Sequence, residues 1–207
     1  MWYQWIMLAA LLLCLGSCVY HLYRIISMGA APEYARKAGN TAMAVRYSFT
    51  GAMNPKNKES ASLHLPTYTA GLIFHAGTFL SILLFFVFLF DINPGMALLR
   101  VFAFFLALSG FSGILILLKR MAKSELRSLS NPDDYISNIL VTAFQLITAL
   151  LIFYPQLYPA YCISATMLLL YFPLGKLKHA LYFFAARYHL GLFYGWRGVW
   201  PPKPISK

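Results

Sequence analysis

Histidines within apolar stretches are the residues of this chain with the clearest capacity for chemistry. His75 stands inside the second long hydrophobic segment, and His179 lies in the last one. A neutral imidazole binds transition metals through one ring nitrogen, and two imidazoles can fill both axial positions of a haem iron. Ionisable side chains at membrane depth are costly and are therefore candidates for a functional site. Both histidines are candidate haem b ligands, or else neutral imidazoles hydrogen-bonded to neighbouring helices.

The positions of the two histidines predict that they face each other at one depth. The segment with His75 leads away from the basic side of the chain, and the segment with His179 returns to it. His75 follows His64 by eleven residues, which is about 16 Å along a helix, and His179 follows Lys176 and Lys178. Two level imidazoles on antiparallel helices of a bundle satisfy a six-coordinate haem iron, which would carry electrons rather than bind a substrate.

Neighbouring residues are candidates for holding the cofactor. Lys176, Lys178 and Arg187 could pair with haem propionates at the basic edge, or could extend to lipid phosphate. Gly71 and Gly77 could give a flat macrocycle room, or could serve close helix packing.

The remaining histidines suggest one further site. His64 and His189 would also lie level with each other, which makes them candidate ligands of a second haem. Against this, Pro66 begins the helix after His64. His21, at the end of the first segment, is expected to be a hydrogen-bonded imidazole.

The composition identifies the class of protein that must position these residues. Of the 207 residues, 60% are hydrophobic and 11% are charged, more apolar surface than one soluble core of this size could bury. Runs of about 20 apolar residues recur, which is the length that crosses ~30 Å of hydrocarbon. The sequence predicts an all-α, multi-pass membrane protein with one membrane domain, 1–207. The predicted spans are about 5–26, 67–91, 96–118, 135–154 and 160–186.

The basic residues predict the orientation of these spans. Sixteen of the seventeen lie on one side, in or beside the loops 27–66 and 119–134 and the tail 188–207, and Arg100 is the exception. The positive-inside rule makes that side cytoplasmic, with the N-terminus outside and the C-terminus inside the cell (inner or plasma) membrane. The net charge of +11 then reflects topology and anionic lipid rather than nucleic acid.

Three further features bear on partners. Cys14, Cys18 and Cys162 form no CxxC pair, so the chain encodes neither an iron–sulfur cluster nor covalent haem attachment. Residues 41–53 could form an amphipathic helix on the membrane or against a partner, or an ordinary loop helix. The residues 131–134, Asn-Pro-Asp-Asp, are predicted to cap the fourth span.

The motifs around the two histidines resemble those of a known family. Five spans, Leu72-Ile-Phe-His-Ala-Gly77 in the second, and Tyr171-Phe-Pro-Leu-Gly-Lys-Leu-Lys-His179 in the fifth resemble the gamma subunit of respiratory nitrate reductase. They also resemble the related membrane cytochromes b of heterodisulfide-reductase-like and dissimilatory-sulfite-associated complexes. The resemblance covers the hydrophobic part of the chain.

The resemblance implies a reduced cofactor content. The family typically holds two haems, and Phe85 and Tyr161 stand where the ligands of the outer haem would be. Both ligands are missing together, which implies that only the inner haem is kept. In that family the quinol site lies toward the outer haem, so its place here is open. The polar candidates are Arg100, Asn138 and Gln145, each of which could instead serve an interhelical hydrogen bond.

The resemblance also implies a function. In such complexes the cytochrome exchanges electrons between membrane quinone and a cytoplasmic iron–sulfur protein. A separate iron–sulfur subunit would be needed here, docked on the loop 27–66 or the tail 188–207. The expected function is that of a cytochrome b subunit of a respiratory oxidoreductase complex, not a complete enzyme. The alternative is a haem-free membrane anchor or scaffold.

Overall fold

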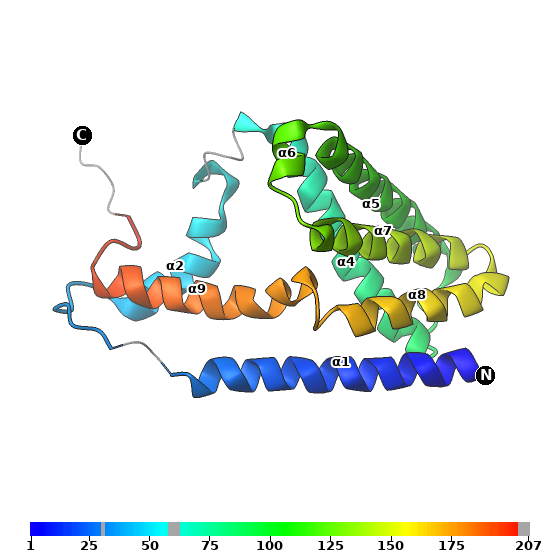
Figure 1. Cartoon of the computed structure of the whole chain (residues 1–207), viewed down its shortest axis with the longest axis horizontal. Coiled ribbons are helices and arrows are strands. Elements are labelled where there is room, and N and C mark those ends of the chain that lie inside the picture. The colour runs from blue at the N-terminus through cyan, green and yellow to red at the C-terminus, as the bar shows by residue number, and fades with distance from the viewer. Residues whose placement is uncertain (30–31, 58–62, 203–207) are drawn as a thin grey trace. The chain divides into compact units, whose positions relative to one another are not determined.

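The computed structural model describes residues 1–29, 32–57 and 63–202, and these residues form helices and connections without a strand (Figure 1). The α-helices are α1 (Trp2–Ser27), α2 (Thr41–Phe49), α4 (Leu65–Leu89), α5 (Met96–Ala122), α6 (Ser124–Ser128), α7 (Pro132–Leu151), α8 (Tyr158–Tyr171) and α9 (His179–Trp196). Short 3-10 turns are η1 (Gly51–Met53), η2 (Pro55–Asn57), η3 (Pro155–Leu157) and η4 (Lys176–Lys178). Of the residues counted on the basic side, Lys58, Lys203 and Lys207 lie outside the described ranges.

The described helices have the lengths and composition expected of a multi-pass membrane protein. Four of them, α1, α4, α5 and α7, are long and apolar enough to cross a membrane. A fifth crossing results if residues 155–171 and 176–196 are taken together as one broken span. The all-helical class predicted from the sequence is therefore confirmed for the described residues, and four to five helices could serve as the predicted spans.

The predicted fifth span, 160–186, is interrupted. Helix α8 ends at Tyr171 because Pro173 has no backbone N–H to continue the helical hydrogen bonds. The N–H groups of Leu174 and Gly175 instead close a turn on the Tyr171 carbonyl, at 3.1 and 2.9 Å. A second helix, α9, begins at His179 and continues beyond the predicted end of the span.

The chain divides into two compact units, each of which is described by itself. Unit 1 consists of Met1–Gly16 and Pro66–Leu177, and unit 2 consists of Ser17–Leu65 and Lys178–Lys207. His75 therefore belongs to unit 1, whereas His179 belongs to unit 2.

Close packing in unit 1 depends on small residues. A Cβ on Gly77 of α4 would overlap Ser109 of α5, and the Ser109 hydroxyl donates to the Ile73 carbonyl at 3.0 Å. From α7, the Gln145 amide donates to the Phe74 carbonyl at 3.1 Å and to the Thr78 hydroxyl at 2.9 Å. These side-chain bonds to α4 tie three helices together at the turn that carries His75.

Unit 2 is built by α2 packing along α9 (Figure 1). Ala44 and Ser48 of α2 are fully buried. A Cβ on Gly191 would lie 2.5 Å from the Val45 Cα, and one on Gly195 would lie 2.5 Å from the Ala44 Cβ. Glycines four residues apart on α9 thus let the two backbones approach closely. Within the segment 41–53, residues Thr41–Phe49 form α2, which packs on α9 of this chain, and Gly51–Met53 form η1. Contact of this segment with the membrane or a partner stays a prediction.

The segment before α2 is also bound to α9. The Arg197 guanidinium donates to both Glu33 carboxylate oxygens, at 2.7 and 3.0 Å. These hydrogen bonds lower the pKa of the Glu33 carboxyl below its usual range. The Trp196 indole N–H donates to the Ala35 carbonyl at 2.6 Å, and the Ala38 N–H donates to the Trp196 carbonyl at 2.7 Å. Parts of the predicted loop 27–66 and tail 188–207 therefore form one folded body.

Candidate cofactor site

His75 lies on an exposed, apolar stripe of α4. Its neighbours one turn away on this stripe, Leu72 and Phe79, are 51% and 69% exposed, and His75 is exposed as well. Gly71 precedes His75 by one helical turn, and a Cβ built on it would meet nothing within 4 Å. His75 therefore lies on an exposed, apolar face of α4, one helical turn from the open space at Gly71.

The depth of His75 within unit 1 follows from contacts at the basic end. There the Lys119 ammonium contacts the Thr67 hydroxyl. His75 is eight residues farther along α4, which corresponds to about 12 Å. It is thus within the apolar part of the helix rather than at its end.

His179 is the first residue of α9 and is exposed. It follows directly on η4, and the half-buried Lys178 occupies the N-cap position. Because His75 and His179 belong to different units, the pairing of the two imidazoles on one iron stays a prediction.

The two glycines near His75 have different surroundings. Gly77 faces Ser109 and Gln145, so its small size serves helix packing, which was one of the two interpretations. Gly71 faces open space. At this glycine, room for a macrocycle stays a prediction.

The candidate propionate partners also differ. Lys176 forms an ion pair with Asp134, whose side chain is 6% exposed. The Arg187 guanidinium lies 5.6 Å from the centre of the Phe183 ring, and Lys178 is half-buried. Lys176 therefore already neutralises a carboxylate of this chain, and its role toward a propionate stays a prediction.

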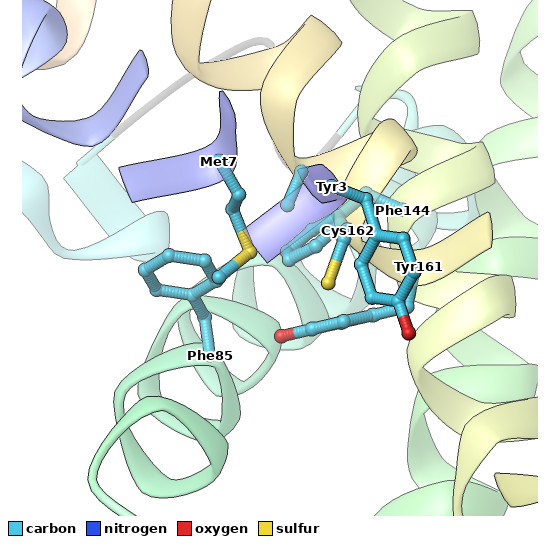
Figure 2. Packing of buried hydrophobic residues seen from close by; sticks show 7 residues of the cluster. Tyr3, Met7, Phe85, Phe144, Tyr161 and Cys162 are labelled. Atoms are coloured by element: carbon cyan, nitrogen blue, oxygen red, sulfur yellow. The ribbon is translucent and has the colours of Figure 1, made fainter. Parts of the chain in front are cut away.

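The positions equated with the outer haem ligands are filled by packed side chains (Figure 2). Phe85 is 5% exposed and Tyr161 is 1% exposed, and both belong to one buried cluster with Tyr3 and Met7. The Tyr161 ring stacks on Phe144 with ring centres 5.5 Å apart. These residues do not fit a haem, since they leave a macrocycle no room and offer no imidazole.

The other histidines lie in unit 2. His21 Nδ1 lies 3.1 Å from the Tyr182 hydroxyl, so the expected hydrogen-bonded imidazole is observed. His64 immediately precedes α4, and His189 lies on α9, and both are exposed. Among the described residues, no group of three or more His, Cys, Asp or Glu could hold a metal ion. A second haem on His64 and His189 stays a prediction.

The quinone candidates have varied environments. Gln145 is fully buried and makes the interhelical hydrogen bonds to α4 that were the alternative for it. Asn138 accepts a 3.3 Å hydrogen bond from Thr142 within α7, and Arg100 is exposed on α5. Sequence reasoning missed an open cavity of about 340 Å³ at the opposite end of unit 1 from Thr67. It is lined by Phe88, Asp91, Ile92, Leu99, Leu151, Ile152, Pro155 and Tyr158.

Sequence reasoning also missed the wider role of the α7 cap. As predicted, Asn131 and Asp134 form a capping box, with reciprocal bonds of 3.1 and 3.0 Å. The same Asp134 pairs with Arg120 at 3.4 Å and with Lys176. The sequence did contain a signal for this role. Only six residues of the chain are acidic, and two of them, Asp133 and Asp134, are adjacent.

Comparison of the chain with protein-family models, with curated proteins and with solved structures gives no match.

Proposed function

We propose that the chain is a cytochrome b subunit of a membrane-bound respiratory oxidoreductase complex. It relays electrons between membrane quinone and a cytoplasmic iron–sulfur subunit through one haem b, with His75 and His179 as axial ligands. The supporting observation is the surrounding of His75, an exposed imidazole on an apolar helix face with open space at Gly71. A bound haem supplies a one-electron carrier, because its iron changes oxidation state.

The residues of the chain would hold and tune this carrier. Each imidazole would bind the iron through one ring nitrogen, and an iron held by both would carry electrons rather than bind a substrate. Leu72 and Phe79 give the face of α4 on either side of His75 an apolar character. The Gln145 and Ser109 bonds to α4 fix the backbone one and two residues before His75. A rigid ligand helix favours rapid electron transfer, because little has to move when the charge changes.

One haem is better supported than two. The buried cluster around Phe85 and Tyr161 occupies the position where the resemblance would place an outer haem. One inner haem would exchange electrons with a partner on the basic side.

The basic surface of unit 2 is the proposed docking site of the iron–sulfur subunit. Its described residues carry a single acid, Glu33, which is bonded to Arg197. Its described cations are Arg24, Arg36, Lys37, Arg46, Lys56, Lys178, Arg187 and Arg197. A partner with an acidic surface would be steered to this unit in a salt-dependent way.

The test is a dithionite-reduced minus oxidised spectrum of the purified, detergent-solubilised protein, with haem quantified per polypeptide. We expect one b-type haem, lost in both His75→Ala and His179→Ala. The matched controls are His64→Ala and His189→Ala, which should keep the full haem content. If either control loses a second haem, the one-haem assignment is wrong. If the intact, partner-bound complex contains no haem, the chain is a membrane anchor or scaffold instead.

A further inference from the structure

The break between α8 and α9 is held from both sides by two adjacent carboxylates. The Tyr171 hydroxyl, on the last residue of α8, donates to Asp133. The Lys176 ammonium, just after the break, pairs with Asp134. The two anchored residues are five positions apart, and both carboxylates belong to the first turn of α7.

The carboxylates are themselves fixed in place. Asp133 also accepts from the Ser137 hydroxyl at 3.0 Å. Asp134 accepts from the Asn131 N–H at 3.0 Å and pairs with Arg120 at 3.4 Å. These contacts hold the Asp134 carboxylate in a fixed position. Its ion pair with Lys176 therefore restrains the lysine as well.

The turn within the break is fitted to this arrangement. A Cβ on Gly175 would overlap the Tyr171 ring and would lie 2.9 Å from an Asp133 carboxylate oxygen. A larger residue at 175 would therefore push against both partners of the Tyr171–Asp133 hydrogen bond. The buried Pro173 ends the preceding helix, so the chain can change direction here.

We propose that Asp133 and Asp134 form a positioning clamp for His179. The clamp holds the chain before the break through Tyr171 and after it through Lys176. His179 starts α9 three residues beyond Lys176, so the clamp holds the stretch of chain that leads directly into this histidine. This inference rests on the proposed function, because it assigns the clamp to the orientation of a haem ligand. None of the four clamp residues touches the iron, so each is a positioning residue.

The first test separates positioning from mere stability. In Lys176→Gln and Tyr171→Phe we expect haem to be lost to a competing apoprotein roughly tenfold faster, which is typical when a group that orients a metal ligand is removed. The low-spin electron paramagnetic resonance signal should shift as well, because it reports the orientation of the two imidazole planes. Lys176→Arg keeps the ion pair and should restore both properties. Glu125→Gln, which removes an exposed charge from the nearby α6, and Tyr154→Phe are the matched controls.

The second test does not require haem. Spin labels at Leu129 and Leu174, which are 83% and 76% exposed, report the distance between the α7 side and the break in a Cys18→Ser background. Lys176→Gln should broaden this distance distribution, and Lys176→Arg should not.

The outcomes are distinguishable. An unchanged distance distribution overturns the clamp itself. A broadened distribution with an unshifted resonance signal and normal haem retention overturns the positioning role. If the intact protein holds no haem, the proposed function fails and the positioning role fails with it, while the distance measurement still decides whether the clamp exists.

Discussion

The Ser48 hydroxyl of α2 donates a 2.8 Å hydrogen bond to the Arg187 carbonyl of α9, across 139 residues of sequence. Ser48 is fully buried, and the same hydroxyl lies 2.7 Å from the Val45 carbonyl in its own helix. A small polar residue can sit between two close helices and still satisfy its hydroxyl group. The bond therefore lies in the α2–α9 interface, which joins parts of the predicted loop and tail in unit 2.

Removing the Ser48 hydroxyl should weaken the α2–α9 interface by a modest amount. We expect Ser48→Ala to reduce the stability of unit 2 by about 1 kcal/mol, the typical net value of one hydrogen bond. Ser27→Ala is the control, since Ser27 is exposed and its hydroxyl donates to the Arg24 carbonyl within its own helix. Thermal unfolding in detergent measures the difference, and an equal effect of both changes would contradict the interhelical role.

Adding a methyl group to a glycine in the α2–α9 interface should reduce stability more than the loss of the Ser48 hydroxyl. In Gly191→Ala the added methyl would lie 2.5 Å from the Val45 Cα, and backbone cannot move aside cheaply. We expect a loss of roughly 1–3 kcal/mol, the usual cost of overpacking, with faster tryptic cleavage at Arg46 and Lys56. Gly16→Ala is the matched control, because its added Cβ would meet nothing within 4 Å. Equal cleavage rates in the two variants would show that α2 does not depend on this contact.

The contact between Gly77 of α4 and Ser109 of α5 in unit 1 allows a paired test of helix packing. Gly77→Ala forces a methyl against Ser109, so it should lower the unfolding temperature. Ser109→Gly removes the obstructing side chain, and the double variant should recover part of that loss, apart from the lost hydrogen bond to Ile73. A double-variant cycle measures this coupling. Strict additivity of the two changes would mean that the residues do not meet.

The buried aromatic cluster predicts an unusual response at Tyr161. Its hydroxyl is buried and has no hydrogen-bond partner among the described residues. Tyr161→Phe removes an unsatisfied polar group, so we expect a neutral effect or a gain of about 1 kcal/mol. Phe144→Ala, which empties the stacked position beside it, should cost roughly 3–5 kcal/mol. Marked destabilisation by Tyr161→Phe would show that the hydroxyl has a partner after all.

Acidification should weaken the attachment of residues 33–38 to α9. The pKa of Glu33 is lowered in the folded chain, chiefly by the hydrogen bonds from Arg197. A carboxyl with a lowered pKa contributes stability above its unfolded value, near 4.3, and loses it as the pH falls through the lower native value. Backbone hydrogen exchange at Ala38, whose N–H bonds to Trp196, should therefore speed up with acid relative to the intrinsic rate.

The pH effect has a direct control. Glu33→Gln cannot titrate, so protection of Ala38 should no longer depend on pH in this range. Glu125→Gln alters an exposed acid elsewhere, so the pH dependence of Ala38 protection should be the same as in the unsubstituted chain. A pH-dependent loss of protection that persists in Glu33→Gln would assign the effect to another group.

Composition and local pattern determined the class of the protein and most of its long helices. A run of 20 or more apolar residues has few alternatives to a spanning helix, because backbone polar groups must be satisfied within the segment. The cap at Asn131 and the start of α4 close to Pro66 could also be predicted from the sequence, since both depend on neighbouring residues. His75 and His179 stood out for the same reason, as imidazoles in apolar surroundings.

Only the tertiary structure decided what the polar and small residues contact. No local pattern could show that Gly77 meets Ser109, that Ser48 meets Arg187, or that Asp133 and Asp134 hold Tyr171 and Lys176. Such contacts join residues far apart in the chain, and a glycine or a carboxylate is compatible with many partners. Pro173 ends α8 within the predicted fifth span, but the contacts of Tyr171 and Lys176 with the two carboxylates join residues about 40 positions apart. Local sequence thus set the helices, and long-range packing set the contacts between them.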